Sequence, residues 1–451
     1  MQFHGIIKFE LKQTIQAMDK ALMDSIAGCG DVNRNVMCAP DPSLSAVHAQ
    51  VYPWAMKISE HLLPQSRAYH EIWLDEPEGK TLVAGGEQND EIEPLYGKHY
   101  LPRKFKIGIS IPPHNEGDVH SNDIGLIAIA EGDTLLGFNV AVGGGLGMTF
   151  GREDTYARLA DNLGFCTPEQ LLDVTHHIVA IQRDFGNRED RKLSRFKYTI
   201  DKYGLDWFRE ELAARCGFEL APVRPYTFTT TGDRFGWNEA IDGQWHLGLR
   251  LEYGRVVDTS AQQIKTALAK IAAEGVCGFR LTANQNVLLT DVSTEYKSLI
   301  EGLLEEHGYA VDASHLSGLR RNSIACVAMG TCPQAMAEAE RYLPTLISRM
   351  EPLMDKYGLL QDEIKIRMTG CPNGCGRSVM AEIGLIGKSP GRYNLYLGGA
   401  FNGERLNVLY RENLDEAGIL DALEPVFADY VAQREQGESF GDFVIRAGYV
   451  S

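Results

Sequence analysis

Two close pairs of cysteines in the last third of the chain could hold a metal centre. Cys326 and Cys332 are separated by five residues, and Cys371 and Cys375 by three, the latter within Thr-Gly-Cys-Pro-Asn-Gly-Cys-Gly-Arg. Four thiolates from two short loops suit either a tetrahedral zinc ion or an iron–sulfur cubane. Structural zinc sites favour tighter spacers of about two to four residues, whereas a cubane accepts ligands that lie farther apart. The spacing favours a cluster and leaves zinc open.

Small residues surround the second cysteine pair. Gly370, Gly374 and Gly376 allow positive φ angles and let the backbone approach an inorganic group closely. Pro372 stiffens the turn and removes one amide donor that would otherwise need a partner. We therefore expect this loop to wrap tightly around whatever the cysteines bind.

The other cysteines are isolated from one another. The chain has nine in total, an odd number, and its amino terminus lacks the basic and apolar segments of an export signal. This usage predicts reduced thiols and a cytoplasmic location. We expect four of the isolated cysteines to be small buried hydrophobic residues: Cys29, Cys166, Cys216 and Cys277.

Charge and length exclude several classes of function. The 451 residues carry a net charge of -17, which disfavours nucleic acid as a partner because phosphate binding needs a basic face. No apolar run approaches the roughly 18 residues of a membrane span. The length predicts about two to four domains of roughly 150 residues. An anionic substrate would require a local positive pocket in this acidic protein.

Segments of the chain repeat in the same order. Residues 106–113 align with 365–372, and 123–127 align with 382–386 at the same offset. Two further blocks follow the same order: 139–144 with 394–399, and 34–38 with 321–326. Repeated modules usually pack about a pseudo-twofold axis, so we expect a shared cleft at their junction. One copy carries the cysteine pairs, whereas the other has Pro112 and His114 near the corresponding positions.

The apolar periodicity predicts a mixed α and β chain. Residues 105–111 and 394–397 alternate as half-buried strands do. The apolar spacing over 333–357 predicts a helix, with Thr331 as its cap and Pro333 in its first turn.

Two further helices and two strands form a small α+β unit in the middle of the chain. The helices are expected over 262–274 and 295–306, and the strands over 278–282 and 286–289. The charged stretch 184–197 is expected to be a solvated loop or helix end.

The cysteine motif, together with Asn-Arg-Asn-Val at 33–36, Leu-Pro-Arg-Lys-Phe-Lys at 101–106 and Gly-Arg-Tyr-Asn-Leu at 391–395, resembles the sirohaem-dependent sulfite and nitrite reductase family. The resemblance extends over essentially the whole chain and is closest to haemoprotein subunits of the assimilatory sulfite branch. It implies that Cys326, Cys332, Cys371 and Cys375 hold a 4Fe-4S cluster. It further implies that the Cys375 thiolate bridges the cluster to the sirohaem iron.

The resemblance also supplies a substrate pocket. Arg34, Lys104 and Lys106 stand where the family places the groups that bind the anion, and the two lysines share one face of a predicted strand. Lysine ammonium groups can pair with sulfite and deliver protons. The carboxylates of sirohaem need many donors, and the family pattern suggests six: Gln2, His4, Arg103, Gln285, Asn373 and Arg377.

The implied function is the six-electron reduction of sulfite to sulfide in sulfate assimilation and cysteine biosynthesis. Arg377 and Lys106 resemble the sulfite branch, because nitrite-reducing relatives tend to carry glutamine and asparagine there. Ferredoxin-dependent nitrite reductase remains an alternative, as does a non-catalytic iron–sulfur or zinc structural protein. No glycine-rich dinucleotide motif follows a predicted strand, so we expect a separate flavoprotein (alpha) subunit as electron donor.

We expect an α+β fold (mixed α/β) with duplicated modules about a pseudo-twofold axis and a ferredoxin-like module. The paired repeats would span 27–235 and 313–451. Residues 1–26 would be the remnant of an N-terminal ferredoxin-like half that packs with 236–312. The family has a substantial segment upstream of the position that is Met1 here, so we expect this chain to be shortened at its amino terminus.

Overall fold

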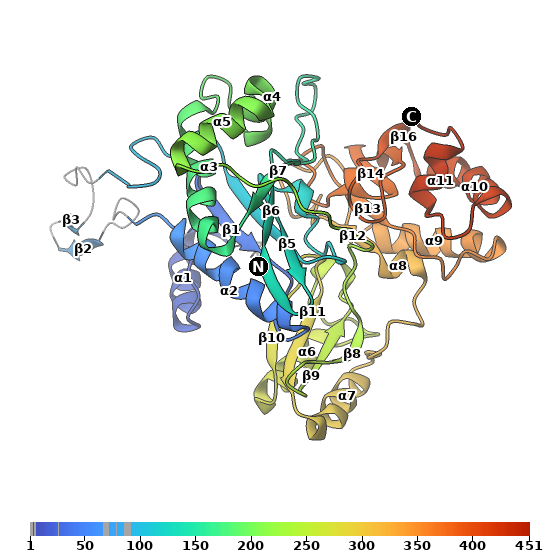
Figure 1. Ribbon diagram of the computed structural model, residues 1–451. Helices are drawn as coiled ribbons and strands as arrows, with labels where there is room; N and C mark the ends of the chain where they lie inside the picture. Colours follow the sequence, from blue (N-terminus) through green and yellow to red (C-terminus); the bar gives the residue numbers. More distant parts are fainter. Residues whose placement is uncertain (1–2, 4–5, 26, 66–71, 78, 85–91) are drawn as a thin grey trace.

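A computed structural model describes residues 3, 6–25, 27–65, 72–77, 79–84 and 92–451. Figure 1 shows two mixed α/β bodies side by side, the first drawn in blue to green and the second in orange to red. A smaller yellow unit lies below them. Each of the three bodies has its own apolar core.

The first body is built on a five-stranded sheet in the order β1-β4-β5-β6-β7. The pairs β1–β4 and β4–β5 are parallel, and β5–β6 and β6–β7 are antiparallel. The strands are β1 (Asn33–Met37), β4 (Phe105–Ser110), β5 (Ile124–Glu131), β6 (Thr134–Val142) and β7 (Asp161–Cys166). Its helices are α2 (Ala46–His61), α3 (Leu171–Phe185), α4 (Phe196–Tyr203) and α5 (Leu205–Cys216). A hairpin, β2 (Ile72–Glu76) and β3 (Gly79–Ala84), projects from it (Figure 1).

The second body repeats this topology. Its sheet has the order β12-β13-β14-β15-β16, again with two parallel pairs followed by two antiparallel pairs. The strands are β12 (Ser323–Ala325), β13 (Ile366–Thr369), β14 (Ile383–Ser389), β15 (Arg392–Leu397) and β16 (Val408–Leu414). The helices are α8 (Gly318–Arg321), α9 (Leu343–Lys356), α10 (Glu416–Gln433) and α11 (Phe440–Arg446).

The two sheets correspond residue by residue. The Lys106 amide donates to Asp123 Oδ2 at 2.9 Å, and the Lys365 amide donates to Glu382 Oε2 at 2.8 Å. These residues occupy matched positions in the aligned blocks, and the parallel pairs that follow them keep the same register. The predicted duplication and fold class are therefore confirmed.

The yellow unit has a four-stranded antiparallel sheet in the order β10-β11-β9-β8 with two helices. The strands are β8 (Gly236–Glu239), β9 (Trp245–Leu249), β10 (Gly278–Leu281) and β11 (Val287–Val292), and the helices are α6 (Ile264–Glu274) and α7 (Lys297–Glu306). The predicted helices and strands of this unit are thus confirmed to within a few residues. The domain limits at 26, 235 and 312 stay predictions.

The helix predicted over 333–357 begins ten residues later, with Pro344 in the first turn of α9. Thr331 and Pro333 do not start it. Backbone amides of the preceding segment are used elsewhere: Ala337 donates to Gly370 O at 3.1 Å, and Glu340 donates to Cys326 O at 3.0 Å. Turns and bends make up most of this segment, and its amides bind carbonyls of the cysteine loops, which overrides its helical periodicity.

The prediction of a solvated stretch over 184–197 is wrong at its end. Lys197 is only 1% exposed, and its ammonium group donates to Gly145 O, Gly147 O and Tyr156 O. Arg195 is half-buried. Only tertiary contacts with the 145–156 segment bury these charges, so no local pattern revealed them.

The amino-terminal segment also differs from expectation. Ile15 and Met18 of α1 (Leu11–Lys20) line a cavity with Val32 and Pro64 of the first body, and in Figure 1 α1 lies beside α2. The predicted packing of residues 1–26 against 236–312 stays a prediction. Cys29 is exposed rather than buried, whereas Cys166 is buried and Cys216 and Cys277 are partly so.

Candidate active site

Strand order brings the two cysteine loops together. Cys326 follows β12 directly, and Cys371 comes two residues after β13. Because β12 and β13 are parallel neighbours, their carboxyl ends meet at one edge of the sheet. There the Gly370 amide donates to Cys326 Sγ at 3.3 Å, so the loops touch.

Glycines make this close approach possible. A Cβ atom at Gly370 would lie 2.6 Å from both Ala328 Cβ and Ala337 O. A Cβ atom at Gly376 would lie 2.4 Å from Met368 O. Both distances are far below van der Waals contact, so only glycine permits this packing. Of the three glycines, Gly374 has the predicted positive φ, 72°, and Gly370 and Gly376 do not. Wrapping of the loop around a bound group stays a prediction.

The four thiols influence one another electrostatically. Burial raises the pKa of Cys326 to about 11, and Cys375 and Cys371 raise it further. Burial also raises the pKa of Cys371, with Cys375 and Cys332 acting in the same direction. Cys371 is buried and Cys375 is exposed. For Cys326 and Cys371, a charged thiolate is therefore unfavourable without a cation to compensate it.

The donor set suits one kind of metal centre better than the other. Within the described residues, no three His, Cys, Asp or Glu side chains form a group that could hold a single metal ion. A cluster with four separated corners fits four thiols spread over two loops, with amide donors close to the sulfur atoms. One such donor is the Asn373 side chain, which lies 3.4 Å from Cys371 Sγ.

The first repeat presents cations toward this loop. Lys104 and Lys106 flank the start of β4, and Arg34 lies on β1, whose Asn33 pairs with Phe105. Arg34 donates to Gly30 O and Gly28 O, which fixes its side chain along the loop before β1. Arg34 and Lys106 thus lie on adjacent strands of one sheet, and Lys104 directly precedes the strand that holds Lys106.

The pKa values of Lys104 and Lys106 are shifted by burial and by nearby charges. Burial lowers the pKa of Lys104 to about 8; Lys106 and Arg195 lower it further, and the Cys375 thiolate opposes them. The pKa of Lys106 is also lowered, by burial and by Arg195, against the opposing effects of Asp123 and Cys375. The Lys106 side chain is exposed, although the charges of Arg195, Asp123 and Arg34 all act on it. We call the surface around Lys104 and Lys106 the recess. Both lysines therefore lie within electrostatic reach of Cys375 in the other repeat.

Arg195 was missed from the sequence. Its Nη2 donates to Asp123 Oδ2 at 2.9 Å, and its buried Nε has no hydrogen-bond partner among the described residues. Burial lowers the pKa of Arg103, with Arg191, Arg195 and Arg34 acting in the same direction. We call the resulting group the cation wall, and it consists of Arg34, Arg103, Lys104, Lys106 and Arg195. The carboxylates acting on it are Asp123 and Asp31, so the cation wall keeps an excess of positive charge in a chain of net charge -17.

The remaining predicted cofactor residues are placed differently. The Gln285 side chain pairs with both the amide and the carbonyl of Ala325, directly before Cys326. The Asn373 amide group contacts Cys371 and Gln334. Arg377 forms a salt bridge with buried Asp118 rather than lying free. Gln2 and His4 lie outside the described residues.

In the second repeat, the positions matching the lysine recess are closed. Lys365, which matches Lys106, is 2% exposed, and its ammonium group donates to Phe401 O. Arg367 occupies the position that matches Gly108 of the first repeat. Its Nη1 lies 2.6 Å from Asp118 Oδ2. Only the first repeat therefore keeps its cations open to a ligand.

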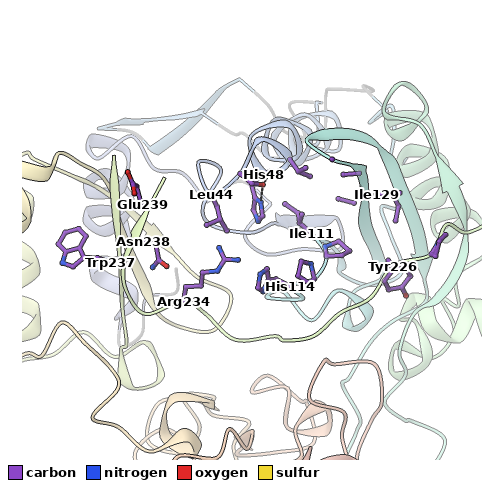
Figure 2. A pocket seen from close by; sticks show the side chains of 18 residues that line it. Leu44, His48, Ile111, His114, Ile129, Tyr226, Arg234, Trp237, Asn238 and Glu239 are labelled. Carbon is purple, nitrogen blue, oxygen red and sulfur yellow. Dashed lines mark hydrogen bonds between the residues drawn. The ribbon is translucent and has the colours of Figure 1, made fainter. Parts of the chain in front are cut away.

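A cavity of about 810 Å³ lies elsewhere, between the first repeat and β8. Figure 2 shows His48, His114 and Arg234 pointing into it, beside Ile111 and Asn238. It contains none of the predicted site residues. Its Pro112–His114 wall occupies, in the first repeat, the place that the Cys371 loop occupies in the second.

Comparisons with known proteins agree with this geometry. The sulfite reductase (NADPH) hemoprotein beta-components of Shouchella clausii (strain KSM-K16) and Bacillus subtilis (strain 168) are 55% and 54% identical over 449 residues, covering 100% of this chain and 78% of each relative. This chain belongs to the sulfite reductase hemoprotein beta-component family. The family's nitrite and sulphite reductase 4Fe-4S domain matches residues 54–220, and its ferredoxin-like half domain matches 239–307.

A solved structure has the same fold as this chain. The NirA protein of Mycobacterium tuberculosis superposes with a TM-score of 0.76 at 22% identity, over 98% of this chain and 75% of that one. The 4Fe-4S domain match falls on the first repeat, whereas the four clustered cysteines belong to the second. None of the described helices is both long and apolar enough to cross a bilayer.

Proposed function

We propose that this chain is the catalytic subunit of an assimilatory sulfite reductase, which reduces sulfite to sulfide with six electrons. The observation that carries this proposal is the cation wall of one repeat facing the exposed Cys375 of the other. Sulfite is an anion that must be held beside an electron source. The recess offers fixed positive charge on one side and the cysteine cluster on the other.

Cys326, Cys332, Cys371 and Cys375 would hold the 4Fe-4S cluster, and Cys375 would bridge it to sirohaem. When bound, these groups supply electrons and an open iron position for the sulfur of sulfite. Arg103, and the Nε of Arg195 that lacks a hydrogen-bond partner among the described residues, suit the carboxylates of sirohaem. Of the predicted carboxylate contacts, Arg103 and Asn373 keep that role in the proposal, and Gln285 would act by fixing Ala325.

Arg34, Lys104 and Lys106 would bind and protonate the substrate. Each basic group about 4 Å from the anion contributes up to about 4 kcal/mol at an effective dielectric constant near 20. Conversion of sulfite to sulfide releases its three oxygens as water and consumes six protons. Lys104, with a pKa of about 8, is charged at neutral pH and close enough to its pKa to donate a proton readily. The planar guanidinium group of Arg34 would orient the oxygens of sulfite.

The electron donor would be a separate subunit. The beta-component name of the relatives implies a partner, and we infer that it is a flavoprotein (alpha) subunit. We place the protein in the cytoplasm, where the five cysteines outside the proposed cluster would stay reduced.

An absorption spectrum and an activity assay of the reconstituted protein test this function together. We expect sharp tetrapyrrole bands above a broad iron–sulfur background, and sulfide formation from sulfite with an artificial electron donor. A spectrum with the broad background alone would contradict the proposal. A strong preference for nitrite over sulfite would favour the ferredoxin-dependent nitrite reductase alternative.

A further inference from the structure

Two residues at matched positions of the repeats carry opposite charges and bind each other. Asp118 follows Lys106 at the same sequence distance as Arg377 follows Lys365. Both have left-handed backbones, with φ of 47° and 53°, and both precede a one-turn helix, Val119–Ser121 and Ser378–Met380 respectively. Arg377 Nη1 lies 2.7 Å from Asp118 Oδ2. This salt bridge therefore joins the repeats across their pseudo-twofold axis.

The Asp118 end of the pair is sealed from water, whereas the Arg377 side chain is 15% exposed. The Asp118 side chain is 0% exposed, and its Oδ2 also binds Arg367 Nη1 at 2.6 Å. A buried carboxylate between two guanidinium groups has a narrowly defined position, because any displacement separates desolvated opposite charges. Asp118 thus acts as a fixed point for the second repeat.

Arg377 transmits this position to the cysteine loop. It stands two residues after Cys375, and its Nη2 donates to Ala283 O at 2.7 Å and to Asn284 Oδ1 at 2.9 Å. One guanidinium group therefore ties the end of the cysteine loop to both the first repeat and the ferredoxin-like unit. Both terminal nitrogens of Arg377 therefore already have partners within the protein, so few of its N–H groups remain to bind a cofactor carboxylate.

The repeat that holds Asp118 also carries the cation wall. We propose that Asp118 is a positioning residue that, through Arg377, fixes the Cys375 thiolate opposite Lys104 and Lys106. This inference rests on the proposed function, because it matters only if Cys375 joins the cluster to sirohaem. The salt bridge at the pseudo-twofold axis then sets the distance between the point of electron entry and the cations that receive the substrate.

The test compares Asp118→Asn and Asp118→Glu with Glu351→Gln in the holoenzyme. Glu351→Gln is the matched control, since Glu351 pairs with Arg320 wholly within the second repeat, away from the cysteines. Absorption and electron paramagnetic resonance spectra report the coupling of cluster and sirohaem, and steady-state assays separate kcat from KM. We expect Asp118→Asn to shift the spectra and lower kcat by about tenfold or more, with a smaller change in KM. Asp118→Glu should give an intermediate shift, and Glu351→Gln the wild-type spectra.

The outcomes separate the two levels of inference. If the wild-type protein binds no sirohaem, the proposed function fails. If it does, and Asp118→Asn keeps wild-type spectra and kcat, the positioning role is overturned while the function stands. Should Asp118→Asn not fold, Asp118→Glu decides: shifted spectra support the role, and unshifted spectra overturn it.

Discussion

Single residues in the recess are adjusted by their neighbours. Lys104 is an ordinary lysine in sequence, yet burial beside Lys106 and Arg195 brings its pKa to about 8. The ammonium form of Lys104 is therefore less stable than that of an ordinary lysine, and it gives up its proton more readily. This is the property that a proton donor needs near neutral pH.

The charge of Lys104 predicts a pH profile. Below pH 8 the side chain is protonated and binds the anion; above it the charge is lost, so kcat/KM for sulfite should fall as pH rises through about 8. Lys104→Met should lower kcat/KM at neutral pH and remove this limb. Steady-state kinetics over a pH range of roughly 6 to 10 measure both. Exposed Lys192→Met serves as the control and should keep the wild-type profile, and a limb that survives in Lys104→Met would assign it to another group.

Arg195 gives a second prediction at this scale. Arg195→Gln removes one charge of the cation wall and frees the Asp123 carboxylate to act on Lys106. We expect KM for sulfite to rise by roughly tenfold, about 1.4 kcal/mol, together with a lower sirohaem content. Arg209→Gln, which breaks an exposed pair with Asp206, should change neither. An unchanged KM and cofactor content in Arg195→Gln would show that the cation wall works without it.

Elements bring these residues together through the ends of parallel strands. The carboxyl ends of β12 and β13 place Cys326 beside the Cys371 loop, and the segment before α9 closes over them through bonds to Gly370 O. Loop packing here leaves no space for a side chain at the glycines. The cluster geometry is thus a property of two strand ends and the loops that follow them.

Gly370→Ala tests the closeness of the loops. The new methyl group would lie 2.6 Å from Ala328 Cβ, so the loops must separate, at a cost of about 1–3 kcal/mol. We expect lower iron and acid-labile sulfide content and a lower melting temperature. Gly302→Ala is the matched control, because it faces open space within α7 and alanine favours helix. Full iron content in Gly370→Ala would mean that the observed loop packing is not required.

The sequence could predict those site residues that belong to local motifs or to the internal repeat, but not those that depend on contacts between distant residues. The cysteines, Lys104 and Lys106 were found because motif spacing and the internal repeat are local or periodic signals. Arg195 and Lys197 were missed because their burial depends on distant backbone carbonyls and on Asp123. The early start assigned to α9 failed because Gly370 O, far along the chain, binds amides that a helix would have used.

At the scale of the whole molecule, the net charge of the chain is negative, whereas the charge of the cation wall is positive. A field of net charge -17 repels an anion at long range, whereas the cation wall attracts it once close. The long-range part is screened over about 8–10 Å at physiological salt, and the recess is screened less.

Ionic strength separates these two contributions. If the cation wall governs capture of sulfite, kcat/KM should fall as salt rises from about 0.01 to 0.5 M, and the dependence should weaken in Lys106→Gln. Steady-state assays with a salt of weakly binding ions measure it. A rise of kcat/KM with salt would instead show that overall repulsion controls capture.

The closed counterpart of the recess has a consequence for mutational tolerance. Lys365 directs its charge to a backbone carbonyl and Arg367 to Asp118, so the second copy of the fold has become scaffold where the first stays open to a ligand. A volume-preserving substitution of Lys365 should therefore change mainly the stability of the fold, whereas one of Lys106 should change mainly the turnover of sulfite. The two positions nevertheless match each other in the internal repeat. The two repeats thus share one backbone fold, whereas their side chains at these matched positions have different roles.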